Sequence, residues 1–160
     1  MDADARKVRK ENYSLEVIKM AEYTANAVQT VQANRNVLFT DTTVESRNNS
    51  ITHREGSGLI NLRGTTNQCR ARFKITFGAN IAVPATGTAG SISLALAING
   101  EAIDSTTMIV TPAAVSEYFN VGRSLYLDIP CGCCSQISVT NVSTQAIAVQ
   151  NASLIVERVA

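Results

Sequence analysis

Three of the four cysteines fall between positions 131 and 134, directly after Pro130. Thiolates are good zinc ligands, but a structural zinc site takes about four ligands, usually as two pairs with short spacings. This stretch supplies only part of such a set. The weak alternative of a metal site would use Cys69, Cys131, Cys133 and Cys134, and our prediction is that the chain binds neither a metal nor a cofactor.

Two other kinds of thiol chemistry fit the same stretch. A disulfide could join Cys69 to one of the later cysteines, although a chain made in the cytosol keeps its thiols reduced. Cys131 and Cys134 have the spacing of a redox motif, but no strand-helix-strand pattern accompanies them. Because Pro130 and Gly132 favour a turn, the interpretation we prefer is a tight connection between strands with small, packed thiols.

His53 is the only histidine, and Glu55 and Ser57 follow it closely. These are the residue types of a hydrolytic triad, in which the histidine activates a serine hydroxyl and an acid orients the histidine. No strand-turn-helix nucleophile pattern surrounds Ser57, and closeness in sequence does not align such groups. The segment from Gly56 to Gly58 likewise lacks the helix and lysine of a phosphate-binding loop. We therefore expect no catalytic residues and no enzymatic activity.

The net charge is close to zero, with 14 basic and 13 acidic side chains in 160 residues. No overall field attracts nucleic acid or an anionic membrane. The N-terminus lacks the apolar core of a signal peptide, and the longest apolar-rich run, residues 92–98, is far shorter than the roughly 20 residues of a membrane-spanning helix. We expect one soluble domain with an appendage, made in the cytosol and without a membrane partner.

The first residues form a charged appendage. Residues 2–12 carry seven charges and little apolar surface, which predicts an arm that cannot build a core alone. Acids interspersed among its bases, and the lack of aromatic residues, favour protein docking over nucleic-acid binding. Ser14 can cap a helix with a weak apolar stripe, so a helix is expected over residues 14–32. We assign residues 1–35 as an anchor whose docking side chains are Arg6, Lys7, Arg9, Lys10, Val17 and Met20.

Beyond residue 36 the hydrophobic pattern has a period of two. Phe73, Ile75 and Phe77 alternate with basic and polar residues, which is typical of a half-buried strand. Residues 92–98 alternate large and small apolar side chains and lead into Asn99 and Gly100, the strongest short hairpin signal. The small side chains predict that the second face of this strand is also covered, with a neighbouring subunit as one candidate.

Further short strands are expected at regular intervals along the chain. Together with the two segments above, they predict a β-sandwich or barrel. The expected ranges are 36–41, 51–54, 58–63, 107–111, 115–120, 124–129, 135–142 and 146–158.

Residues 36–160 resemble, in order, the jelly-roll domains of the C1q/TNF-like family. The stretch GLINLRGTTNQCRARFKITFGANI is similar to the family's strand, glycine turn and aromatic-alternating strand, and SISLALAINGEAI is similar to its hairpin. SLYLDIPCGCCSQISVTN resembles the strand, turn and strand that follow, and NASLIVERVA resembles the closing strand. Where the family usually has a Gly-Asp turn, this chain has Gly132 followed by Cys133.

The resemblance implies an all-β, antiparallel jelly-roll sandwich of about ten strands in residues 36–160, preceded by the N-terminal arm and helix of residues 1–35. It also implies a homotrimer. Small trimeric domains with such an arm resemble head-decoration and head-fibre proteins of tailed bacteriophages. That likeness implies a non-enzymatic virion protein, docked through its arm onto the major capsid protein or another virion protein. The alternatives are a module that binds a host-surface glycan or receptor, and a bacterial spore-surface protein.

Overall fold

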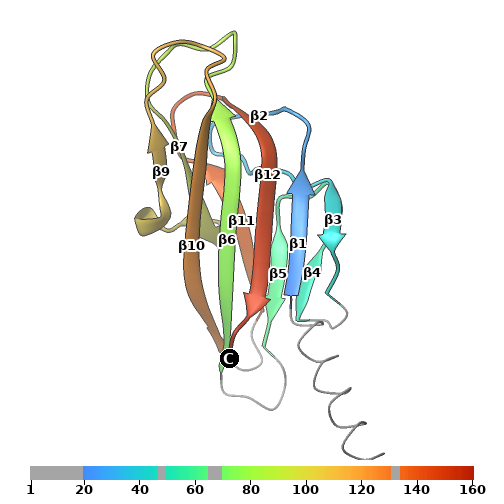
Figure 1. Cartoon of the computed structure of the whole chain (residues 1–160). Coiled ribbons are helices and arrows are strands. Elements are labelled where there is room, and N and C mark those ends of the chain that lie inside the picture. Colours follow the sequence, from blue (N-terminus) through green and yellow to red (C-terminus); the bar gives the residue numbers. More distant parts are fainter. Residues whose placement is uncertain (1–19, 47–49, 65–69, 131–133) are drawn as a thin grey trace, which may run out of the picture.

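The computed structural model describes residues 20–46, 50–64, 70–130 and 134–160. These residues form twelve strands, which pack as two six-stranded antiparallel sheets (Figure 1). The predicted all-β jelly-roll sandwich is confirmed. Within the described ranges, no helix is long and apolar enough to cross a membrane.

The front sheet in Figure 1 contains the three longest strands, and it also contains the first and the last strand along the described chain. Its order is β10-β6-β12-β1-β3, and β2 also pairs with β12. The strand bounds are β10 (Phe119–Pro130), β6 (Arg70–Ala82), β12 (Ile147–Arg158), β1 (Met20–Ala25), β3 (Asp41–Val44) and β2 (Gln29–Val31).

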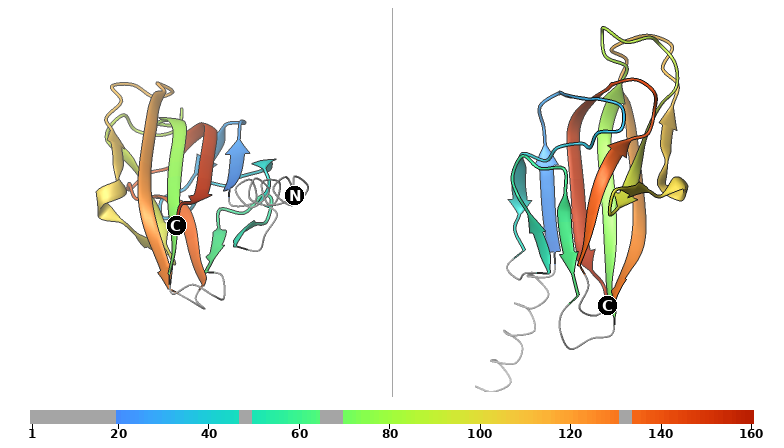
Figure 2. Two further views of the ribbon diagram at one scale, coloured as in Figure 1. Left: turned by 60° about the horizontal axis from the view of Figure 1, so that its bottom comes forward. Right: turned by 180° about the vertical axis from the view of Figure 1, so that it is seen from behind.

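The second sheet lies behind the first, and Figure 2 shows it from the rear. Its order is β4-β5-β11-β7-β8, and β9 also pairs with β7. A short 3-10 helix, η1 (Asp104–Thr106), precedes β9. The strand bounds are β4 (Ile51–His53), β5 (Ile60–Arg63), β11 (Cys134–Asn141), β7 (Ile92–Ile98), β8 (Glu101–Ala102) and β9 (Met108–Val110).

The hydrophobic core lies between the two sheets. The predicted alternation in β6 is confirmed, since Phe73, Ile75 and Phe77 are almost fully buried and face inward. Ile92, Leu94 and Leu96 of β7 reach the same core from the second sheet. Each strand therefore contributes one apolar side, as expected for side chains that alternate between faces.

The predicted hairpin after β7 is also confirmed. Asn99 and Gly100 both have positive φ, 51° and 84°, which is the combination that a two-residue type I′ turn requires. Ile98 pairs with Glu101 directly across the turn, and Ala97 with Ala102 beyond them. The side-chain oxygen of Asn99 accepts a hydrogen bond from the backbone N–H of Gln136 at 2.9 Å, which ties the turn to β11.

The small-residue side of β7 is covered by the chain itself. Ala95 and Ala97 are both 0% exposed in a single copy, so the prediction that this side is covered is confirmed. A second subunit is not needed to cover it. Thr106 of η1 contributes to this packing, because its Oγ1 accepts from the backbone N–H of Leu96 at 2.9 Å and donates to the carbonyl of Ile103 at 2.7 Å.

A second polar anchor joins strands that are distant in sequence. Asn141, at the end of β11, is fully buried, and its amide nitrogen donates to the carbonyl oxygens of Val31 and Gln145 at 3.0 and 2.8 Å. Its side-chain oxygen accepts from the backbone N–H of Ser143. All the polar atoms of this buried side chain are therefore used, as burial of an amide requires.

The helix expected over residues 14–32 is wrong for residues 20–31, which form β1 and β2 instead. Ala21, Tyr23 and Ala25 point into the core, while Met20 and the two other alternate residues of β1 face outward. β1 pairs with β12 along its whole length. A weak helical stripe could bury little surface alone, whereas this strand completes a sheet, so tertiary packing decides the conformation. Ser14 and Val17 lie outside the described residues.

Two expected strands are also displaced. Residues 36–40 do not form a strand, although Asn36 makes an isolated bridge with Thr140 and the backbone N–H of Val37 donates to Val139. Residues 115–118 are irregular, and the strand begins only at Phe119. In both cases the segment belongs to a loop at the end of the sandwich. Only some of its backbone groups pair with a neighbouring strand, so no continuous strand forms.

Candidate assembly surfaces

Most of the residues assigned to the docking arm lie outside the described ranges. Met20 opens β1, where its side chain is 40% exposed on the outer side of the front sheet. Its role in docking stays a prediction, as does that of the arm residues outside the described ranges, which are Arg6, Lys7, Arg9, Lys10 and Val17.

Three of the four cysteines also lie outside the described residues, namely Cys69, Cys131 and Cys133. Cys134 begins β11 as a free, exposed thiol. β10 ends at Pro130 in the front sheet, and β11 begins at Cys134 in the second sheet. Among the residues that the structure describes, no group of three or more histidine, cysteine or acidic side chains is placed to hold a metal ion.

His53 has a structural role in the described geometry. Its Nε2 lies 2.8 Å from the carbonyl oxygen of Ser57, and that contact closes the turn between β4 and β5. The hydroxyl of Ser57 instead accepts from the backbone N–H of Leu59, so histidine and hydroxyl are not arranged as a nucleophile and its base. The His53 ring packs against the rings of Tyr23 and Phe39, with centroids 4.5 and 6.3 Å away.

Tyr23 is the one buried tyrosine in the described part of the chain, and it is 3% exposed. Burial raises the pKa of its hydroxyl to about 12, and the carboxylate of Glu45 adds to this rise by repelling the phenolate. The aromatic cluster of Tyr23, Phe39 and His53 therefore favours uncharged tyrosine. It holds β1 against the second sheet.

The outer side of the front sheet is an extended surface that nothing in the single chain covers. We call the outward side chains of β10, β6, β12, β1 and β3 the sheet face. The strand register arranges them in rows: Gly122, Gly78, Ser153 and Thr24, then Ser124, Thr76, Ile155 and Glu22, then Tyr126, Lys74, Glu157 and Met20. The exposed apolar members are Tyr126 at 64%, Val44 at 42%, Ile155 at 40% and Met20 at 40%. The first row is small and uncharged, the other two also contain the charged residues Glu22, Lys74 and Glu157, and exposed apolar side chains gathered on one face are typical of a surface that another polypeptide covers.

A second uncovered surface runs along the edge of the sandwich beside β10. β10 is the edge strand of the front sheet, and β9 of the rear sheet lies next to it in Figure 1. Four apolar side chains are only partly buried there, and we call them, with the neighbouring Arg123, the β10 flank: Ile98, Val110, Leu125 and Leu127. A twelve-residue edge strand is also an open template for association. The flank therefore needs a cover as much as the sheet face does.

One groove of about 500 Å³ lies between the segment after β2 and the turn before β5. It is lined by Gln29, Thr30, Val31, Gln32, Arg35, Asn36, Leu38, Ser57, Gly58 and Leu59. The side-chain amide of Gln29 donates to the carbonyl of Leu38 and accepts from its backbone N–H, both at 2.9 Å. The chain can approach so closely here because Gly58 has no side chain: a Cβ would lie 2.7 Å from the carbonyl oxygen of Val37.

A second depression of about 510 Å³ lies at the lower end of the sheet face and is lined by Arg72, Tyr126, Asp128, Val159 and Ala160. The guanidinium of Arg72 donates two hydrogen bonds to the carboxylate of Asp128, at 2.7 and 3.1 Å. That contact lowers the pKa of Asp128 and raises the pKa of Arg72. Paired charges of this kind position strands, and neither residue has the features of a catalytic acid or base.

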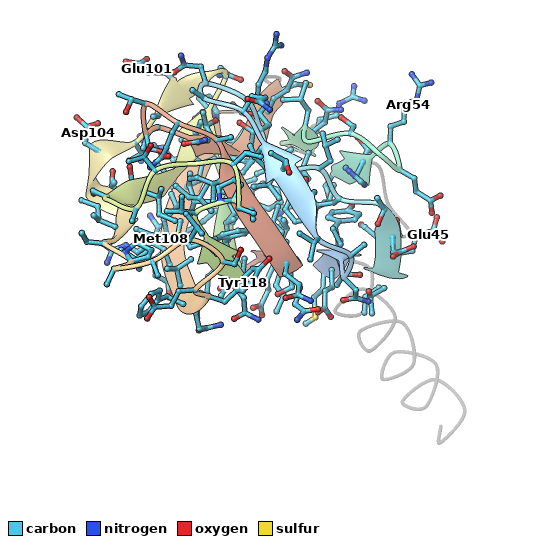
Figure 3. The ribbon with its side chains drawn as sticks, turned by 90° about the horizontal axis from the view of Figure 1, so that it is seen from above. Glu45, Arg54, Glu101, Asp104, Met108 and Tyr118 are labelled. Carbon is cyan, nitrogen blue, oxygen red and sulfur yellow. The ribbon has the colours of Figure 1, made fainter. Side chains whose placement is uncertain are left out.

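The loops at the upper end of the sandwich form an uncharged tip (Figure 1). The tip consists of residues 83–91 and 111–118, and Glu117 is its only charged residue. Val115, Tyr118 and the adjoining Phe119 expose about two fifths of their surfaces. Figure 3 shows Tyr118 well away from the acidic residues Glu101 and Asp104.

The sequence did not lead us to the sheet face or the β10 flank as sites. The alternation in residues 124–129 was available, with Tyr126 and Asp128 on one side and Leu125 and Leu127 on the other. It does not say which strands lie beside it. The rows of the sheet face join residues as far apart in the sequence as Met20 and Glu157, and such neighbours appear only once the register is known.

Comparisons with known proteins bear on the fold. No protein-family model matches the chain, and no curated protein matches it in sequence. Among solved structures, the Eiger TNF of S. frugiperda is similar with a TM-score of 0.67 at 11% identity, over 88% of this chain and 92% of that one. The globular domain of the zebrafish complement 1qA protein is similar with a TM-score of 0.53 at 12% identity, over 86% and 94%. The chain therefore has the C1q/TNF-like jelly-roll fold.

Proposed function

We propose that this chain is a non-enzymatic module that assembles as a homotrimer and serves as a structural component of a virion, as a capsid decoration or head-fibre protein. The observation that carries the self-association is the presence of two uncovered, partly apolar surfaces on one copy, the sheet face and the β10 flank. The C1q/TNF-like fold supports three as the number of copies in this assembly.

The two surfaces differ from each other, and this determines the kind of assembly that they support. A contact between unlike surfaces is repeated from copy to copy and gives a ring when the rotation closes. The sheet face and the β10 flank meet along β10 and face different directions (Figure 2, left). A copy whose flank lies on the sheet face of the next is therefore turned relative to it, which favours a small closed ring.

Native mass spectrometry of the full-length chain tests the assembly. We expect a trimer whose mass is unchanged by a reductant or a chelator, because no thiol or metal chemistry is needed to hold it. A Tyr126→Asp variant, which places a charge on the sheet face, should shift the population toward monomer. The matched control is Val28→Asp, an exposed residue between β1 and β2. A wild-type monomer at all concentrations would refute the trimer.

The virion role is supported by the combination of a charged N-terminal segment and a domain with its own core. β1 begins at the lower end of the sandwich in Figure 1, and the uncharged tip lies at the other end. Because β1 belongs to the front sheet, we now propose that the anchor comprises residues 1–19, with Met20 at its boundary. Three anchors on one trimer act together, so each contact with a capsid protein can be weak.

Deletion of residues 1–19 tests the anchor. The shortened chain should keep the trimer mass and the circular dichroism spectrum of a β-sandwich, and it should no longer co-sediment with particles that retain the full-length chain. Charge reversal of Arg6, Lys7, Arg9 and Lys10 should give the same loss of particle binding. Continued incorporation of the deleted chain into particles would remove the anchoring claim and leave the trimer intact.

The tip favours a second candidate function, binding of a neutral surface glycan or receptor. Tyr118 and Phe119 are exposed aromatic residues in a segment with a single charge, and aromatic rings stack well on the apolar faces of sugars. A glycan array probed with the intact trimer tests this candidate. Binding that is lost in a Tyr118→Ala variant would favour it over a purely structural role.

A further inference from the structure

Arg123 is an unpartnered cation on the β10 flank. It pairs across the strands with the core residue Phe77, so its side chain starts on the inner side of the sheet, and it is exposed only because β10 is the edge strand. In the described part of the chain it forms no hydrogen bond or ion pair. Its neighbours on the same side of β10 are apolar, Val121 and Leu125. A guanidinium flanked by apolar side chains is well suited to form an ion pair with a carboxylate.

Glu22 is an unpartnered anion in the middle of an apolar part of the sheet face. The residues directly opposite it are Ile155 on β12 and Val44 on β3, both about two fifths exposed. Lys74, a basic residue of the sheet face on β6, lies opposite Glu157 instead. Glu22 likewise has no hydrogen bond or ion pair within the described residues. Among the residues that the structure describes, nothing therefore provides a counter-charge for this half-buried carboxylate.

The two residues lie at nearly the same level along the strands. Arg123 is aligned with Phe77, Phe77 with Leu154, and Leu154 with Tyr23. Glu22 is the residue next to Tyr23, so the two levels differ by one residue, or about 3.4 Å. When a ring closes around an axis that runs along the strands, neighbouring copies are not shifted along that axis. Side chains at one level on the flank then meet side chains at the same level on the sheet face.

We propose that Arg123 of one copy forms an ion pair with Glu22 of the next copy, and that this pair sets the alignment of the β10 flank on the sheet face. The inference rests on the proposed self-association and names the contact that specifies it. The occupant of the sheet face is therefore a second copy of this chain. Apolar side chains lie beside both charges, Val121 and Leu125 beside Arg123 and Ile155 and Val44 beside Glu22. Docking would bury these side chains around the pair, exclude water from it and suppress misaligned docking.

Charge reversal tests the pair on the full-length chain. Arg123→Glu and Glu22→Arg each place like charges opposite each other, so each should raise the concentration at which half of the chain is trimeric by at least about tenfold. The double variant restores opposite charges at every interface of the ring and should return that concentration to within about threefold of the wild-type value. Sedimentation equilibrium measures all four proteins, and circular dichroism checks that each is folded.

Matched controls come from the turn between β4 and β5. Arg54→Glu and Glu55→Arg make the same charge changes at exposed positions, and Figure 3 places Arg54 at the far side of the molecule from Met108 of β9. Neither control should change the assembly.

The outcomes separate the pair from the proposed function. Single reversals that behave like the controls, or a double variant that is no better than the single ones, would overturn the pair and leave the trimer standing. A wild-type chain that is monomeric throughout would overturn both.

Discussion

The buried side-chain amide of Asn141 donates a hydrogen bond to the carbonyl oxygen of Val31 at 3.0 Å, and so joins the end of β11 to β2. The same nitrogen also donates a hydrogen bond to the carbonyl oxygen of Gln145, in the segment that leads into β12. Replacement by alanine leaves these carbonyls without a donor in a place that excludes water. We expect Asn141→Ala to lower the free energy of unfolding by about 2 to 3 kcal/mol.

Urea unfolding followed by circular dichroism checks this value. The control is Asn61→Ala, since Asn61 is exposed on β5 and has no such role. Equal stability of the two variants would mean that the Asn141 network contributes nothing to the fold.

Replacement of Gly58 by a larger residue should cause a steric clash, without any contribution from backbone strain. A Cβ at this position would lie 2.7 Å from the carbonyl oxygen of Val37 and 2.8 Å from the Cβ of Asn36, and neither atom can move freely. Gly58→Ala should therefore lower the stability by about 1 to 3 kcal/mol. Gly90→Ala is the matched control, because the nearest atom to its Cβ would be 4.0 Å away. Thermal denaturation of the two variants should differ clearly, and identical midpoints would contradict the close approach.

Tyr23 predicts a loss of stability at high pH. Its pKa in the folded chain is about 12, above the value of about 10 for an exposed tyrosine. The group therefore contributes stability that is fully present below about pH 10 and is lost as the pH rises toward 12. Spectrophotometric titration of the phenol groups should show a late-ionising component that Tyr23→Phe removes. A titration curve of the same shape in the variant, scaled to one fewer tyrosine, would count against the buried environment.

The Arg72 and Asp128 pair predicts a dependence at low pH. Hydrogen bonds from Arg72 lower the pKa of Asp128, so the pair contributes stability that is present above about pH 4 and is lost as the pH falls through the lowered value. The effect should be small because the pair is exposed to solvent. Asp128→Asn should flatten the acid side of a plot of melting temperature against pH. Asp104→Asn, at an exposed site on η1, serves as the control. A steeper acid loss in Asp128→Asn than in the wild type would contradict the sign.

Local sequence patterns predicted the elements whose pairing partner is adjacent or whose alternation is strong. Phe73, Ile75 and Phe77 mark the inner side of β6, and Asn99 with Gly100 marks a turn because both residues tolerate positive φ. These features follow from the preferences of a few neighbouring residues. They determine strands and a hairpin, and from their number the sandwich.

The parts that could not be predicted depend on partners distant in sequence. Residues 20–25 resemble a weak helix until β12 is placed beside them, and then Tyr23 has a core to enter. Glu22 and Arg123 are two unremarkable charges in the sequence. Only the register of four strands shows that they lie within one residue of the same level. This alignment cannot be predicted from the sequence until it is known which strands pair and in which register.

The contact between Gln29 and Leu38 has a consequence for the solubility of the protein. A strand backbone with a free N–H and C=O at its edge invites the strand of another molecule, and such edges start ordered aggregation. At Leu38 the carboxamide of Gln29 satisfies both groups, just as a neighbouring peptide unit would. One side chain thus takes the place of an added strand. It leaves the backbone N–H and C=O of Leu38 with no free valence for the strand of another molecule at this margin of the sandwich.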